Sequence, residues 1–125
     1  MGLLDGVLGN ASEIDPEKIQ QEFSPILAPG ERVERAYQLI RDYFVFTDKR
    51  FFLVDKQELT GSKVEYHSIP YKSITHFSVE TAGTFDLDAE LKIWISSTAA
   101  PLQKKFNKKL SIYEVQSVLA SYVLK

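Results

Sequence analysis

Two short runs of residues, 43–47 and 50–55, carry large apolar side chains at nearly every position. A polar break at 47–50 separates them. Successive side chains of a strand point to opposite faces, so both faces of both runs are apolar. A small domain normally buries one face of a strand, and leaving a large apolar side chain in water forgoes about 1.5–3 kcal/mol. The pattern therefore predicts a second cover over these two strands.

Alternation of apolar and polar positions predicts further strands between residues 31 and 107. It is strictest in "FDLDAELKIWIS", which starts at Phe85, and weakest in "PLQKKFN", which starts at Pro101. Gly61 and Gly83 mark turns. Together with the two apolar runs, the predicted strands are 33–40, 43–47, 50–55, 64–69, 73–80, 85–95 and 101–107.

A helix is predicted at each end of the chain. The first begins at Pro16 with Asp15 as its cap, and Pro25 ends it near Ser24. Its apolar positions recur at helical spacing. The second helix opens with a Ser-x-x-Glu capping box at 111–114. Its predicted buried stripe is Ile112, Val115, Leu119 and Tyr122.

The order helix, about seven short strands, helix predicts a mainly β (α+β) fold, a small antiparallel barrel or sandwich. A chain of 125 residues is long enough for one core. We expect a single domain over 1–125, with an N-terminal helical extension at 1–28, strands over 31–107 and a C-terminal helix at 111–124. The formal net charge of -2 argues against a nucleic-acid binder, and the absence of cysteine excludes disulfides and thiolate zinc sites.

Three segments carry a resemblance to a known family: "LIRDYFVFTDKRFFLVDKQ", "KVEYHSIPYKSITHFSVETAG" and "FDLDAELKIWIS". They resemble the signature of the bacterial pleckstrin-homology (PH) domain family, and the similarity runs from about residue 2 to residue 123. The resemblance implies a PH-like barrel of about seven antiparallel strands with a C-terminal capping helix. It also implies a bacterial cytoplasmic protein without known enzymatic activity, similar to proteins that form ring-shaped homo-oligomers, with a pentamer as the ring considered.

The eukaryotic relatives that bind phosphoinositides use a basic cluster in the first hairpin loop. Here that loop holds only Arg41, beside Asp42, with Lys56 and Lys63 in the neighbouring loop. The lysines at 104, 105, 108 and 109 form the only basic run, which can attract an anionic surface. The alternative is a solvated rim, since charged side chains are mostly exposed. The candidate ligand-binding residues are Arg41, Lys56, Lys63, Lys104 and Lys105.

Candidate chemistry elsewhere is sparse. Asp86, Asp88 and Glu90 share a strand face, but they form a linear comb with no turn to wrap an ion, so no metal site is expected. His67 and His76 are the only histidines, and no nucleophile-elbow or phosphate-loop pattern accompanies them. We expect no enzymatic activity, cofactor or catalytic residue, while a histidine-assisted hydrolase stays an open alternative.

The second cover over 43–55 has two candidates. One is the N-terminal helix, through Ile19 and Phe23, and the other is a second subunit. The subunit hypothesis predicts a non-enzymatic binding and assembly module that forms a homo-oligomeric ring and contacts an unidentified protein partner. The alternative function is a peripheral membrane or anionic-ligand binder that uses the basic residues; the main hypothesis expects no membrane contact. The candidate interface residues are Tyr43, Val45, Phe51 and Leu53.

Overall fold

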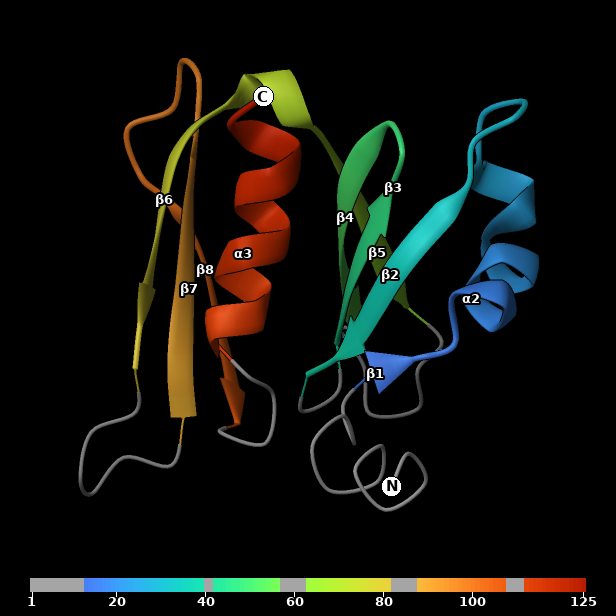
Figure 1. The fold of residues 1–125 in the computed structure, drawn as a ribbon, viewed down its shortest axis with the longest axis horizontal. Coiled ribbons are helices and arrows are strands. Elements are labelled where there is room, and N and C mark those ends of the chain that lie inside the picture. The colour runs from blue at the N-terminus through green and yellow to red at the C-terminus, as the bar shows by residue number, and fades with distance from the viewer. Residues whose placement is uncertain (1–12, 40–41, 57–62, 82–87, 108–111) are drawn as a thin grey trace. The chain divides into compact units, whose positions relative to one another are not determined.

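The computed structural model describes residues 13–39, 42–56, 63–81, 88–107 and 112–125 (Figure 1). The chain folds into two compact units, one over Ser12–Pro70 and one over Tyr71–Lys125. The described residues of each unit form one antiparallel sheet and one α-helix. Among the described residues, no helix combines the length and the apolar character needed to cross a membrane.

The first unit is a five-stranded sheet in which each strand pairs antiparallel with its sequence neighbours. Helix α2 (Pro16–Phe23) and the 3-10 turn η1 (Ser24–Ile26) stand between the first two strands in the chain. The strands are β1 (Glu13–Ile14), β2 (Val33–Gln38), β3 (Tyr43–Thr47), β4 (Arg50–Lys56) and β5 (Val64–Pro70). The predicted strands of this unit are confirmed, whereas β1 is too short to leave a periodic signal.

Helix α2 forms where the sequence places its boundary signals. The Asp15 carboxylate accepts a hydrogen bond from the main-chain N–H of Glu17 at 3.0 Å, and Pro16 occupies the first turn, where no N–H is needed. Ile19 and Phe23 lie one turn apart and are both buried. The chain then reverses through Gly30, whose φ of 78° favours glycine.

One face of β3 and β4 is covered by α2 (Figure 1). The Phe23 ring meets the Phe52 ring edge-on, with ring centroids 5.3 Å apart. This geometry is one that aromatic pairs prefer. Helix α2 therefore covers this face, as the hypothesis of an N-terminal helical cover predicts. The core cluster that it completes contains Ile19, Phe23, Val33, Ala36, Val45, Phe52 and Val54.

The opposite face of the same strands is buried as well. Phe44 lies opposite Leu53 in the register, and Phe46 lies opposite Phe51. The Phe46 and Phe51 rings stack with centroids 4.7 Å apart, and all four side chains are at most 3% exposed. Side chains on both faces are thus buried, and the apolar pattern by itself does not require a second subunit.

The second unit is a three-stranded sheet of β6 (Ile74–Glu80), β7 (Asp88–Ile95) and β8 (Leu102–Asn107), preceded by the 3-10 turn η2 (Tyr71–Ser73). Ala89, Leu91 and Ile93 form the buried face of β7, and Phe106 of β8 is buried beside Ala89. Helix α3 (Ile112–Val123) packs against β6 and η2. The strict alternation in the sequence thus reports one buried and one outer face.

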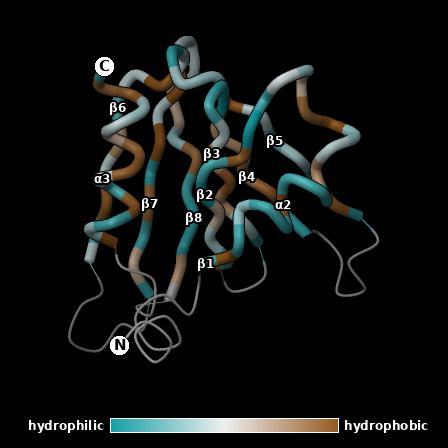
Figure 2. The backbone as a smooth tube through the Cα atoms, turned by 45° about the vertical axis from the view of Figure 1, so that its right-hand side comes forward, coloured by the Kyte–Doolittle hydropathy of each residue, from teal (hydrophilic) through white to brown (hydrophobic). Residues whose placement is uncertain are grey.

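The buried stripe of α3 agrees with the sequence at Ile112, Val115 and Leu119, and Val118 joins it. Hydrophobic and hydrophilic segments alternate along α3 (Figure 2). Tyr122, the fourth predicted member, is half-buried and stacks on Tyr71 with ring centroids 4.6 Å apart. The predicted capping box at 111–114 and the start of the predicted strand 85–95 fall partly outside the described residues.

The prediction of a closed barrel needs correction, because the strands form two separate hydrogen-bonded sheets. A mainly β fold with a C-terminal helix and a short N-terminal helix is confirmed. The single domain over 1–125 stays a prediction.

Candidate functional site

Lys56 is the candidate ligand-binding residue that the first unit describes most fully. Its ammonium lies 3.1 Å from the Tyr43 hydroxyl and 4.7 Å from the centroid of the Tyr43 ring. The hydrogen bond to Tyr43 raises the pKa of Lys56; burial opposes this, while the nearby Tyr43, Glu22 and Tyr66 add to it. Lys56 is therefore half-buried and engaged with an aromatic neighbour.

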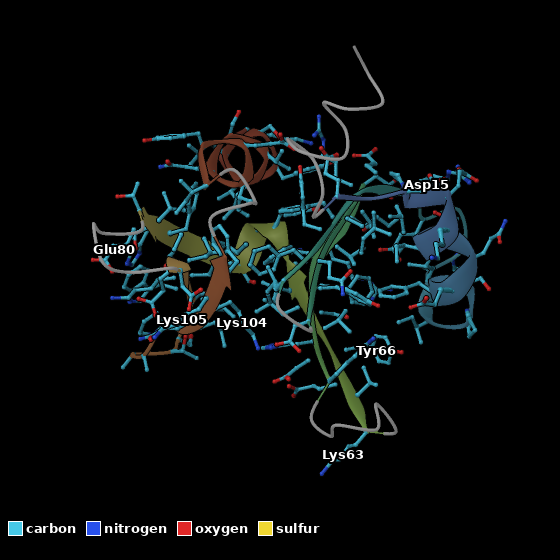
Figure 3. All side chains as sticks on the ribbon, turned by 90° about the horizontal axis from the view of Figure 1, so that it is seen from below. Asp15, Lys63, Tyr66, Glu80, Lys104 and Lys105 are labelled. Carbon is cyan, nitrogen blue, oxygen red and sulfur yellow. The ribbon has the colours of Figure 1, made fainter. Side chains whose placement is uncertain are left out.

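The other residues of this rim do not join Lys56 in a described cluster. Arg41 lies outside the described residues. Lys63 is exposed just before β5 and points away from the sheet in Figure 3, whereas Tyr66 on β5 points toward α2. Asp42 accepts a hydrogen bond from the main-chain N–H of Lys56 at 3.0 Å, so its carboxylate binds the end of β4. Among the described residues of this rim, no cationic side chains come together at one point.

Lys104 and Lys105 are adjacent on β8, and adjacent strand residues point to opposite faces (Figure 3). Lys104 lies opposite Leu91, on the face that carries the buried residues. Lys105 lies opposite Glu90, on the outer face. The two lysines therefore lie on different faces of β8, and their role as ligand-binding residues stays a prediction. Residues 108 and 109 lie outside the described residues.

A row of charges crosses the outer face of the second sheet. Glu80 on β6 lies opposite Glu90 on β7, and Glu90 lies opposite Lys105 on β8. The row therefore reads acid, acid, base from one edge of the sheet to the other. Like charges directly opposite each other destabilise a sheet, whereas opposite charges stabilise it. This row could not be predicted from the sequence alone, because it depends on the register between strands.

The described residues offer no metal centre: no group of three His, Cys, Asp or Glu side chains among them is placed to hold an ion. Asp88 and Glu90 share the outer face of β7, while Asp86 lies outside the described residues. His76 stacks on Trp94 with ring centroids 4.3 Å apart. The Thr75 hydroxyl lies 3.1 Å from Nδ1 of His76 and donates a hydrogen bond to the Trp94 carbonyl oxygen at 3.2 Å. His67 lies half-buried on β5.

The first unit also contains a buried polar cluster that the sequence did not predict. The Glu31 side chain, whose residue is 2% exposed, receives two hydrogen bonds from the Arg50 guanidinium, at 2.8 and 2.9 Å. The Thr47 hydroxyl donates at 2.6 Å and the Ala28 N–H at 2.8 Å. Arg50 also donates to the Ile26 carbonyl at 2.8 Å. The cluster therefore ties the end of η1 to the β3–β4 hairpin.

Burial by itself would raise the pKa of the Glu31 carboxyl. Its hydrogen bonds from Arg50, Thr47 and the Ala28 N–H, together with the Arg50 charge, outweigh burial and hold the pKa below its usual value. Glu31 is therefore an ionised side chain with a structural use. Its position after Gly30 gives it the pattern of a turn residue, so the sequence carries no signal of its burial.

The four candidate interface residues do not form one surface. Tyr43 and Val45 belong to the face under α2, whereas Phe51 and Leu53 belong to the opposite face. Val45 and Phe51 are 0% exposed and Leu53 is 3% exposed, so only Tyr43 is half-exposed. Of the four, Tyr43 alone is accessible enough to contact another molecule, and its role as an interface residue stays a prediction.

The comparisons with known proteins agree with the fold. The family model for the bacterial PH domain matches residues 2–123. The Bacillus subtilis protein YjqA is 59% identical over 122 residues, covering 97% of this chain and 98% of YjqA. The crystal structure of a pleckstrin-homology domain from Shewanella amazonensis SB2B has a TM-score of 0.87 and 54% identity, covering 99% of this chain and 100% of that one. A DUF1696 family protein with a pleckstrin-homology domain, from Shewanella loihica PV-4, has a TM-score of 0.78 and 51% identity, with coverage of 90% and 96%.

Proposed function

The chain belongs to the bacterial PH domain family, and from this membership we propose that it is a non-enzymatic binding and assembly module that forms a closed homo-oligomeric ring. The ring acts in the bacterial cytoplasm, which suits a chain without cysteine, and presents several copies of one surface to a protein partner.

The observation that supports assembly is the position of β6 at one end of the second sheet. Among the described strands, β6 pairs with β7 alone. A strand at the end of a sheet is a template for pairing with another chain. This replaces the buried side chains of β3 and β4 as the reason to expect association.

A ring is favoured over an open chain of subunits. Contact between two different edges is heterologous, and a heterologous contact either closes into a ring or continues into a fibre. A closed ring leaves no edge for further growth, so it stays soluble.

The lack of converging catalytic groups on the described residues supports a binding role. The Thr75 hydroxyl lies close to the His76 ring. A nucleophile–base arrangement usually also needs a third group that orients the imidazole, and no carboxylate among the described residues hydrogen-bonds to this ring. The family is one of PH-like domains, in which a binding surface is the expected functional unit.

The alternative, a peripheral binder of anionic surfaces, loses its main support in the described geometry. Lys104 and Lys105 face opposite sides of β8, and Lys56 is engaged with Tyr43. Membrane attraction adds up over clustered cations, at roughly 1 kcal/mol for each residue near the surface. The divided lysines therefore favour the assembly module.

The two functions are separated by measuring the solution mass and the pelleting with acidic liposomes on the same preparation. Assembly predicts a discrete mass that is a multiple of the 14.2 kDa chain, without co-sedimentation. A monomer that pellets with acidic liposomes, and is released by salt, would replace the proposal with the alternative.

A further inference from the structure

We propose that the open side of β5 binds an extended peptide segment of a partner protein, which joins the first sheet as a further strand and places a carboxylate beside Lys63. This inference rests on the proposed function, because it names the surface that each copy presents to its protein partner. Three features of the first unit support it: a strand at the end of the sheet, an exposed aromatic side chain and an exposed cation.

β5 lies at one end of the five-stranded sheet. Among the described strands it pairs with β4 alone, from Val64 opposite Lys56 to Pro70 opposite Arg50. For residues 64–69, this pairing accounts for the main-chain hydrogen bonds made within the described part of the chain. In an antiparallel pair, alternate residues direct their N–H and C=O groups away from the partner strand. These are the groups that a further strand can bind.

Tyr66 is the exposed aromatic side chain beside this edge. It lies opposite Val54, which belongs to the core cluster under α2. Its ring meets the Phe23 ring edge-on, with centroids 5.4 Å apart, and Figure 3 shows it directed toward α2. Yet Tyr66 is 44% exposed. An aromatic ring that is held on one side and open on the other is a typical anchor in protein interfaces, since little side-chain freedom remains to be lost on binding.

Arg50 brings a second exposed apolar residue to the same edge. Its guanidinium donates to the Ser68 hydroxyl at 3.0 Å and to the Ile26 carbonyl at 2.8 Å. Ser68 lies two residues after Tyr66, on the same face of β5. Ile26 is 40% exposed. Exposed apolar side chains that gather in one place mark interaction sites, so an apolar side chain of the bound strand fits here.

The charge at the start of β5 favours an acidic ligand. Lys63 directly precedes the strand, is exposed, and projects from the sheet in Figure 3. It makes no ion pair with any carboxylate in the described part of the chain. Glu65, two residues later, is exposed as well. A bound strand with an acid opposite Lys63 and a base opposite Glu65 therefore gains attraction at both positions, whereas the reverse order is repelled.

A second copy of this chain fits the same edge less well. The other end of the first sheet is β1, whose two residues cannot match the length of β5. Antiparallel pairing of two β5 strands about Tyr66 places Lys63 opposite Ile69 of the other copy, which offers no carboxylate. A partner protein that brings its own acid satisfies the edge better.

The test uses a fluorescein-labelled peptide with the core Thr-Val-Leu-Lys-Val-Asp and the full chain. When the peptide runs antiparallel to β5, its Leu falls opposite Tyr66 and its Asp opposite Lys63. Fluorescence anisotropy should show saturable binding. Tyr66→Ala should weaken it by at least about tenfold, because an aromatic anchor is lost. Lys63→Glu should weaken it by about fivefold to tenfold, because attraction is replaced by repulsion.

Two modified peptides separate the contributions of charge and main chain. A peptide with Lys in place of its Asp should bind Lys63→Glu more tightly than it binds the unmodified chain. N-methylation of one alternating set of peptide amides should abolish binding, and N-methylation of the other set should leave it, because only one set pairs with β5.

The control variant is Lys72→Glu, which reverses an exposed lysine in η2. It should change the affinity by no more than about twofold, since isolated surface charges contribute little. Circular dichroism of every variant checks that the fold is kept.

The outcomes separate this site from the assembly. Saturable binding that Tyr66→Ala weakens and that follows the exchange of charges supports the β5 site. No saturable binding, or binding that survives both N-methylated peptides, overturns the site and leaves the assembly standing. A peptide that dissociates the assembly shows that β5 lies between copies, which overturns the proposal of a partner strand. An unmodified chain that is monomeric yet binds the peptide overturns the ring and supports the site.

Discussion

At the scale of the residue, Glu31 is a buried carboxylate that joins several segments of the first unit. Its carboxylate is buried and bound by Arg50, Thr47 and the Ala28 N–H, and the same guanidinium reaches the Ile26 carbonyl. Removing one partner of a buried ion pair leaves the other charge uncompensated. The pair therefore fixes where the chain leaves η1 and enters β2.

Replacing Glu31 with Gln should lower the free energy of unfolding by about 3 kcal/mol, the lower end of the range for a broken buried pair, because Arg50 keeps some contact with solvent. Urea denaturation measures it. The matched control is Glu17→Gln, which breaks an exposed pair with Arg32 whose side chains are 65% and 59% exposed. That change should cost less than about 1 kcal/mol. Equal losses in the two variants would contradict the account.

Stability should also fall in acid through Glu31. Its pKa in the folded protein is held below the ordinary value of 4.5, so the folded state favours the ionised form. The contribution is fully present above the unfolded pKa and is lost as the pH falls toward the folded pKa. The Glu31→Gln variant lacks this contribution, so its loss of unfolding free energy relative to the unmodified protein should shrink below pH 4.5. Denaturation curves at a series of acidic pH values measure the deficit, and a deficit that grows in acid would refute the assignment.

Residues with a local role were predictable and residues with a remote partner were not. Asp15 caps α2 from the adjacent position, so its role can be read from its neighbours in the sequence. Glu31 binds Arg50, which lies two strands later in the chain, and Lys105 of β8 lies opposite Glu90 of β7. Both pairings depend on how distant segments align, and a single sequence does not record that alignment.

At the scale of the element, α2 is the cover that the apolar runs of β3 and β4 require. Phe23 is 1% exposed and touches the rings of Phe52 and Tyr66 edge-on. Phe23→Ala should destabilise the protein by about 3–5 kcal/mol, the usual cost of truncating a buried phenylalanine. Ile26→Ala, at a neighbouring position that is 40% exposed, should cost less than about 1 kcal/mol. Thermal or urea unfolding compares them, and similar losses would show that α2 is not a tight cover.

The periodicity of the sequence predicted the individual strands well, but it did not predict whether those strands close into a barrel. The runs at 43–47 and 50–55 became β3 and β4 because their composition and turn signals are local. The two-residue β1 is too short to show any period, and closure of a barrel depends on pairing between strands far apart in the sequence. The two-faced apolar pattern correctly required a second cover, but it did not say which part of the chain supplies it.

At the scale of the whole molecule, the scattered cations predict weak and unselective lipid binding. Lys63 and Lys105 are exposed, and Lys105 stands opposite Glu90. Isolated exposed charges are screened beyond about 8 Å at physiological salt. Titration with soluble phosphoinositide headgroups at this salt should therefore show no saturable binding. A stereospecific micromolar affinity that is lost in Arg41→Ala would refute this expectation.

Assembly is the central claim, and the solution mass of the unmodified full-length chain tests it most directly. Light scattering across micromolar to millimolar concentrations should give one discrete species at a whole multiple of 14.2 kDa, with dissociation only on dilution. A well-behaved monomer of 14.2 kDa over the entire range would contradict the account.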